Sequence, residues 1–171
     1  TTTPLQAANM YPNVYLGLYP DGRVGPGKTG QNTLGILKEG GNKTNRGDYI
    51  NARFALTWKP VEDLSITGSY KPTWQMTKTK TFSKAVPYYD AYATDIILGY
   101  LSGHATNDLT EARNDANSYE LSFIANYDKS FADSHNFNAM LGYEEYYYYH
   151  EALEASSTSM AIGDFPYLDL A

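Results

Sequence analysis

Four stretches of the chain alternate apolar and polar side chains with a period of two, and polar turns join them in two pairs. The clearest stretch runs over residues 64–77 and has one apolar and one polar face. Its apolar face comprises Leu64, Ile66, Gly68, Tyr70, Pro72, Trp74 and Met76. A half-buried strand of a water-soluble protein usually keeps such a pattern for about 4 to 8 residues. A longer strand that is apolar on one face is typical of a transmembrane β-barrel.

The length of this pattern fits the thickness of a membrane. Leu64 and Trp74 are ten residues apart, which is roughly 33 Å at about 3.3 Å per residue. A strand tilted by about 40° then rises roughly 25 Å, the height of the apolar band on an outer-membrane barrel. Phe137 and Tyr147, in the fourth stretch, have the same separation.

The order of strands and loops agrees with this interpretation. We expect four strands, at about 48–58, 64–80, 113–128 and 136–153, which form hairpins over 48–80 and 113–153. The segments between them are expected to be long extracellular loops, at 1–47, 81–112 and 154–171, with short elements at 13–18 and 96–101. Outer-membrane barrels alternate short periplasmic turns with long outer loops in this way. The predicted fold is all-β, an antiparallel long-strand meander forming part of a transmembrane β-barrel.

Aromatic residues lie at both ends of the predicted apolar band. The chain contains 17 Tyr but only 6 Phe, and Tyr suits an interface because its ring is apolar and its hydroxyl polar. We expect the membrane-interface aromatics to be Trp58, Tyr127 and Phe137 at the inner end, and Trp74, Tyr147 and Tyr149 at the outer end. Alternation leaves Tyr146 and Tyr148 on the polar face, as candidates for stacking against a ligand.

Charge and composition argue against several other kinds of partner, site and structural element. The net charge of −6 disfavours a nucleic-acid partner, because phosphates would be repelled. The absence of cysteine excludes disulfides, thiolate metal sites and cysteine nucleophiles. No run of 18 apolar residues exists, so we expect no transmembrane helix.

The sequence contains one motif found in nucleotide-binding enzymes and several residues of types that bind metals. For both we favour an interpretation without that function, apart from calcium in the loops. Residues 22–29 match the phosphate-binding pattern GxxxxGKT, but the glycine-rich sequence around them favours a surface loop, and we expect no enzyme. The three histidines are too far apart in sequence to suggest a metal site. The loop carboxylates Asp90, Asp95 and Asp108 are candidates for calcium, and no other cofactor is expected.

Both hairpins resemble those of a known family. Residues 51–70, NARFALTWKPVEDLSITGSY, resemble a hairpin in the barrel of SusC-like TonB-dependent transporters. The same holds for residues 121–131, LSFIANYDKSF, and 135–145, HNFNAMLGYEE, and for the ending FPYLD at 165–169. The resemblance covers most of residues 34–171.

The resemblance implies uptake of glycans or peptides across the outer membrane of a Gram-negative cell. Energy would come through TonB, acting on the rest of the protein, and a SusD-like surface lipoprotein would cap the outer side. The family's barrel has about 22 strands around a plug, so we expect this chain to be an internal piece of such a barrel in contact with outer-membrane lipid. Candidate lumen-facing contacts for the cargo are Arg53, Lys71, Gln75 and Glu120.

Two other classes of function stay open. Four to six strands do not close around a lumen, since about eight are needed. The chain could therefore be a soluble β-sheet binding or adhesin module, or a small barrel formed by several copies. Detergent dependence distinguishes a membrane protein from the soluble module. A P-loop enzyme would instead bind ATP with magnesium and lose it in Lys28→Ala.

Overall fold

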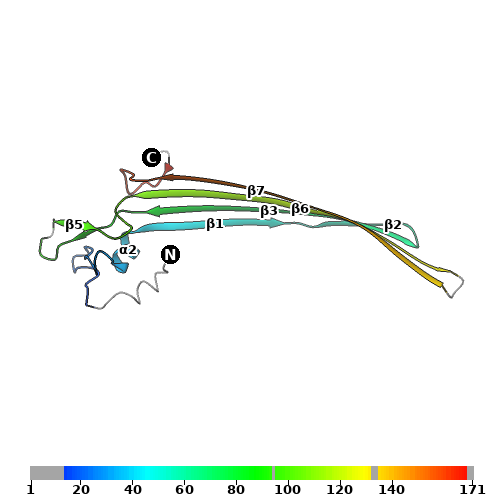
Figure 1. Cartoon of the computed structure of the whole chain (residues 1–171), viewed down its shortest axis with the longest axis horizontal. Coiled ribbons are helices and arrows are strands. Elements are labelled where there is room, and N and C mark those ends of the chain that lie inside the picture. Colours follow the sequence, from blue (N-terminus) through cyan, green and yellow to red (C-terminus); the bar gives the residue numbers. More distant parts are fainter. Residues whose placement is uncertain (1–13, 94, 132–134, 169–171) are drawn as a thin grey trace. The chain divides into compact units, whose positions relative to one another are not determined.

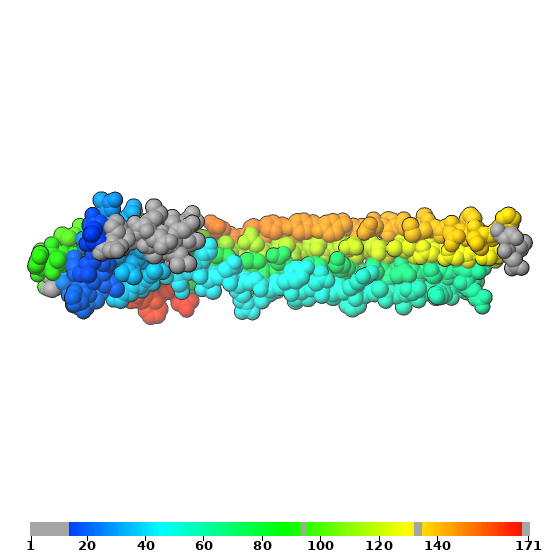
Figure 2. All heavy atoms as spheres, turned by 90° about the horizontal axis from the view of Figure 1, so that it is seen from below, coloured from blue at the N-terminus to red at the C-terminus, as the bar shows by residue number. Residues whose placement is uncertain are grey.

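The computed structural model describes residues 14–93, 95–131 and 135–168. Within them, helix α2 (Thr33–Glu39) precedes seven strands: β1 (Gly41–Asn51), β2 (Phe54–Val61), β3 (Leu64–Ser83), β4 (Pro87–Tyr89), β5 (Ile97–Tyr100), β6 (Asp108–Phe131) and β7 (His135–Ser157). One sheet has the order β1-β3-β6-β7, with β2 also paired to β3, and β4 pairs with β5. Figures 1 and 2 show β1, β3, β6 and β7 side by side in this order. The predicted all-β class is confirmed.

The chain divides into two compact units. The loop unit comprises Thr1–Asn45, Thr79–Ala112 and Glu154–Ala171, and the strand unit comprises Arg46–Lys78 and Arg113–Leu153. The strand unit therefore contains most of the two predicted hairpins, and the loop unit most of the segments between them.

Strands β2 and β3 pair as the alternating pattern predicts. They run antiparallel, with Phe54 opposite Tyr70 and Leu56 opposite Gly68. Side chains on directly opposite residues of a sheet lie on the same face. The apolar residues of the two strands thus share one face.

The first predicted strand, at 48–58, is interrupted in the structure. β1 ends at Asn51 and β2 begins at Phe54. In the gap, the amide of Ala52 donates to the carbonyl of Pro72 at 3.1 Å. Pro72 has no N–H to return, so the ladder loses a hydrogen bond at this point. The pattern of apolar residues carries no information about such a break.

The long strands extend further than the sequence pattern predicts. β3, β6 and β7 have 20, 24 and 23 residues, whereas a membrane crossing needs about 9–11. β1 begins at Gly41 rather than near residue 48, and β6 at Asp108 rather than near 113. The additional residues are mainly polar on both faces. Backbone pairing continues through them although the burial signal, on which the prediction relied, has ended.

The loop unit contains conventional buried cores. One cluster consists of Val24, Val86 and Leu101, and a second consists of Phe82, Leu109 and Met160. Five of these six residues are aliphatic or thioether side chains. The second short element, expected at 96–101, is confirmed as strand β5, which pairs with β4.

The long segment before the first hairpin contains helix α2, which the sequence pattern did not predict. Asn32 caps this helix, because its Oδ1 accepts from the amide of Gly35 at 3.1 Å. Gly35 lowers helix propensity, but a Cβ there would lie only 2.5 Å from Val24. The glycine is therefore needed for close packing. The earlier element expected at 13–18 is limited to an isolated bridge between Leu18 and Val24, and residue 13 lies outside the described residues.

Candidate membrane-facing surface and polar face

One face of the strand unit carries large apolar side chains that no other part of the unit covers. Leu56 and Leu141 are each 76% exposed, and Phe54, Trp58 and Phe137 are also exposed. Together with their neighbours they line the face that the alternating pattern predicts to be apolar. Contiguous exposed apolar area of this kind marks a surface that contacts something other than water.

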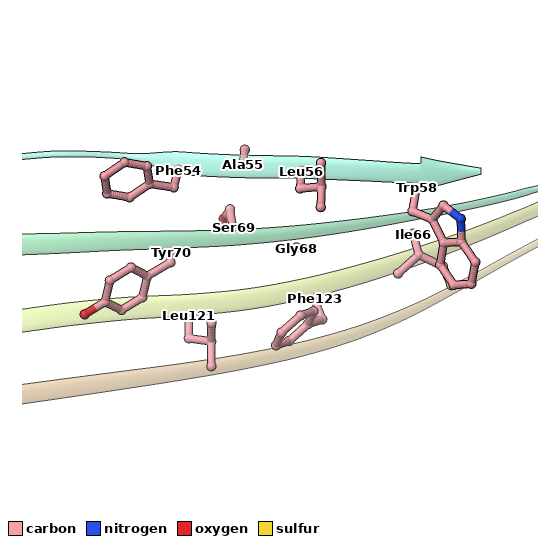
Figure 3. A pocket seen from close by; sticks show the side chains of 10 residues that line it. All are labelled: Phe54, Ala55, Leu56, Trp58, Ile66, Gly68, Ser69, Tyr70, Leu121 and Phe123. Carbon is pink, nitrogen blue, oxygen red and sulfur yellow. The ribbon is translucent and has the colours of Figure 1, made fainter. Parts of the chain in front are cut away.

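This apolar face contains a shallow hollow of about 420 Å³. Figure 3 shows Trp58 and Ile66 at one end of it and Phe54 and Tyr70 at the other. Gly68 lies between them and contributes no side chain. A Cβ on Gly68 would lie 3.0 Å from the ring of Phe123, so the missing side chain lets this ring lie close against β3.

Aromatic rings form two groups on the same face. Tyr119 stacks on Tyr147 with ring centroids 5.3 Å apart, and Tyr70 lies 5.8 Å from Tyr119. Tyr127 and Phe137 meet edge to face at 6.2 Å. Four of these five rings belong to β6 and β7, so ring contacts link the last two strands at two separate levels.

The structure gives each predicted interface aromatic a position. Tyr147 takes part in the first ring group, and Tyr127 and Phe137 form the second. Trp58, Trp74 and Tyr149 are exposed. Their position at a membrane interface stays a prediction.

Glu145 is a polar exception on the apolar face. Its two carboxylate oxygens accept hydrogen bonds from the hydroxyls of Tyr119, at 2.7 Å, and Tyr143, at 2.9 Å. The carboxylate is thus surrounded by the polar ends of aromatic side chains. This arrangement lowers the cost of placing a charged group among apolar residues.

The opposite face carries polar contacts between strands. Thr57 and Thr67 share a hydrogen bond of 3.0 Å, and Ser69 and Ser122 one of 2.8 Å. Further polar contacts across this face are Lys71–Glu120, at 3.6 Å, Asn51–Thr73, at 3.1 Å, and Asn138–Asp128. The two faces of one sheet therefore differ in chemistry along the length of the apolar band.

Two of the four predicted cargo contacts lie together and two lie apart. The ammonium of Lys71 pairs with the carboxylate of Glu120, whereas Arg53 occupies the break between β1 and β2 and Gln75 is exposed further along β3. Tyr146 and Tyr148 are exposed on β7. No ligand contact follows from these positions alone.

An ion pair joins the hairpins at the turn end of the strand unit. The ammonium of Lys129 lies 3.0 Å from the carboxylate of Asp63, and the amide of Asp128 donates to the carbonyl of Asp63. The hydrogen bond to Asp63 raises the pKa of Lys129 above its ordinary value. This contact was not predicted, because partners 66 residues apart leave no local signal in the sequence.

In the loop unit, Arg23 holds two segments together. Its guanidinium donates to Asp21 at 2.6 Å and to the carbonyl of Asp90 at 2.9 Å. The same group lies 5.2 Å from the ring of Tyr19 and 5.9 Å from that of Tyr89. The backbone amide and then the side chain of Arg23 hold the pKa of Asp21 below its ordinary value.

The GxxxxGKT segment does not have the local structure of a phosphate-binding loop. Lys28 pairs with Gln31 in a turn, and α2 begins only at Thr33. The carbonyl of Gly25 points to the buried side chain of Asn32. Lys28 and Thr29 are exposed, whereas Val24, Gly25 and Gly27 are buried, so the segment is only partly a surface loop. Asp90, one of the candidate calcium ligands, accepts hydrogen bonds from the amides of Tyr92 and Ala93. Among the described residues no group of three or more metal-ligating side chains occurs, and the calcium expectation stays a prediction.

Comparisons with protein-family models, with curated proteins and with solved structures gave no match. In the part of the chain that the structure describes, no helix has both the length and the apolar character that crossing a membrane requires.

Proposed function

We propose that the chain is a wall segment of a TonB-dependent transporter of the SusC-like type in the outer membrane of a Gram-negative cell. The strand unit contributes to the β-barrel, with its apolar face toward lipid and its polar face toward the lumen. The loop unit belongs to the extracellular side. The whole transporter takes up a glycan or peptide, works with a SusD-like lipoprotein, and receives energy through TonB.

The observation that carries the proposal is the contrast between the two faces of the strand unit. Leu141 and Met140 are neighbours on β7 with exposed fractions of 76% and 75%, yet alternation places them on opposite faces. The face of Leu141 carries Phe54, Leu56 and Trp58, whereas the other face carries hydrogen-bonded hydroxyl groups and an ion pair. Such a difference between faces is expected where lipid is on one side and water on the other.

The length of the strands supports the same proposal. Each of β3, β6 and β7 has more residues than the 9–11 that a tilted crossing requires. The excess lies at the loop-unit end, as expected if the strands continue beyond the membrane into the outer loops.

The proposal is tested by labelling Leu141 and Met140 in the membrane. The chain contains no cysteine, so Leu141→Cys and Met140→Cys each provide one labelling site here, with cysteines elsewhere in the full protein replaced by serine. A fluorescent maleimide is attached to each variant, and the protein is reconstituted into bilayers. We expect a spin-labelled acyl chain to quench the label at position 141 strongly and the label at position 140 weakly.

The opposite quencher completes the test. Iodide in the aqueous phase should quench the label at position 140 more than the label at position 141. Equal quenching of both labels by iodide, with no effect of the lipid quencher, contradicts the proposal and favours a soluble β-sheet module. The mass of the denatured polypeptide isolated from native membranes gives a second check, since a barrel of about 22 strands with a plug requires a mass on the order of 100 kDa.

A further inference from the structure

The hollow on the apolar face has the dimensions of a site for one hydrocarbon chain. It extends along the strands from the level of Trp58 to that of Phe54, four residues apart, which is roughly 13 Å at about 3.3 Å per residue. The hydrocarbon core of a bilayer is about 30 Å thick. With the strands tilted by about 40°, the hollow rises about 10 Å along the membrane normal. It therefore fits within one leaflet, which is about 15 Å thick.

The lining of the hollow is mainly apolar, with Ser69 and Tyr70 as the residues that carry hydroxyl groups. Phe54, Leu56 and Trp58 come from β2, and Leu121 and Phe123 come from β6. Gly68 forms the floor, because it leaves the space that a side chain would fill. A volume of about 420 Å³ lies in the range of about 300–1,000 Å³ found for sites of small ligands.

We propose that this hollow binds one acyl chain of a membrane phospholipid. The inference rests on the proposed function, which places this face against lipid. A height that fits within one leaflet and a mainly apolar lining favour a chain from the bilayer as the ligand. The chain enters at the Trp58 end, because that end lies nearest to the turn of β2 and β3, where the polar headgroup region begins.

Two variants test the site against a matched control. Leu56→Trp places a larger side chain inside the hollow, whereas Leu141→Trp makes the same change on the same face outside it. Gly68→Ala is the second hollow variant, since its Cβ would occupy the floor of the hollow and lie 3.0 Å from the Phe123 ring. If Leu56→Trp does not assemble, Gly68→Ala still tests the site.

The measurement is native mass spectrometry of the full protein, extracted in mild detergent and washed to remove loosely bound lipid. We expect the unmodified protein and Leu141→Trp to retain one phospholipid per barrel at this site. Leu56→Trp should reduce the retained fraction at least tenfold, and Gly68→Ala should reduce it by several-fold.

Several results overturn the inference. They are a loss of lipid in all variants including the control, retention in all variants, an adduct with the mass of a free fatty acid, and an adduct with the mass of the detergent. The proposed function has an independent readout in the labelled position 141. Lipid-phase quenching there with no change in retained phospholipid rejects the acyl-chain site and leaves the barrel assignment intact.

Discussion

Two leucine side chains of the loop unit are buried, whereas none of the leucines in the strand unit is. In the loop unit, Leu101 and Leu109 are 1% and 0% exposed and pack in two small cores. In the strand unit, Leu56 and Leu141 are exposed, and aromatic rings accompany them on the same face. One sequence therefore forms dry cores in one region and leaves its apolar residues uncovered in the other.

This difference indicates that the two units are adapted to different surroundings. The loop unit buries aliphatic residues from distant segments, as a domain in water does. The strand unit orders its polar contacts on one face and leaves the other without a covering layer. A region that folds against lipid has no reason to bury such residues in its own interior, because lipid chains are as apolar as leucine.

The largest expected effect is the loss of a core side chain in the loop unit. Leu101→Ala should lower the local free energy of unfolding of the first core by about 2–5 kcal/mol, because it removes a buried side chain and leaves a cavity. Leu98→Ala, at a residue that is 51% exposed, should change it far less. Hydrogen exchange of the amides in β4 and β5 measures both. Equal effects of the two variants would mean that this core does not stabilise the loop unit.

The next prediction compares the two faces of the strand unit directly. Leu141→Arg should destabilise the protein in a bilayer by up to about 2–4 kcal/mol, the range for arginine on a lipid face near the midplane. Met140→Arg, on the opposite face, should cost much less. Unfolding by denaturant in lipid vesicles measures both free energies. In a water-soluble sheet both positions are equally exposed, so both variants would stay within about 0.5 kcal/mol of the unchanged protein.

The strands of this protein could be predicted because alternation is a local signal. Leu64 to Trp74 show it directly, and β3 has the predicted faces. The break at Ala52 depends on Pro72 in another strand, and the pair of Lys129 and Asp63 depends on how the hairpins meet. These contacts join residues distant in sequence, and the apolar pattern does not encode them.

Helix α2 and the hollow were not predicted, because they too depend on contacts between residues distant in sequence. Gly35 and Gly68 look unfavourable for a helix and a strand, respectively, when read by propensity alone. In the structure each glycine provides space for a neighbour, Val24 and Phe123 respectively. The signal for each site is thus the absence of a side chain, whose meaning depends on tertiary packing.

A smaller effect is expected from the buried amide that organises the loop unit. Asn32 is 0% exposed, and its Nδ2 donates to the carbonyls of Gly17 and Gly25. Asn32→Ala removes these bonds and the helix cap, so the segment around α2 should lose about 1–3 kcal/mol of local stability. Asn32→Asp keeps the cap, but a buried carboxylate oxygen would then face the two carbonyl oxygens, so it should destabilise the segment at least as much as Asn32→Ala. Limited proteolysis of the loop unit measures both variants, and an unchanged cleavage rate in Asn32→Ala would contradict the role assigned to this amide.

The smallest effect concerns the acid sensitivity of the loop unit. Hydrogen bonds from the amides of Ala93 and Tyr92 hold the pKa of Asp90 below its ordinary value, and those from Arg23 do the same for Asp21. A carboxyl with a lowered pKa in the folded state stabilises that state above its unfolded pKa of about 3.9. This contribution is lost as the pH falls through the folded-state pKa, so the loop unit should open progressively below about pH 4.

Carboxyl-carbon NMR titration of the two aspartates separates their causes. Arg23→Gln should raise the titration midpoint of Asp21, because the guanidinium is one of its main partners. It should change Asp90 less, because backbone amides dominate there. Asp90→Asn should weaken the acid dependence of loop-unit proteolysis while the amide oxygen still accepts the two backbone bonds. Equal shifts of the two titration midpoints in Arg23→Gln would contradict this assignment. They would mean that Arg23, and not the backbone amides, sets the pKa of Asp90 as well as that of Asp21.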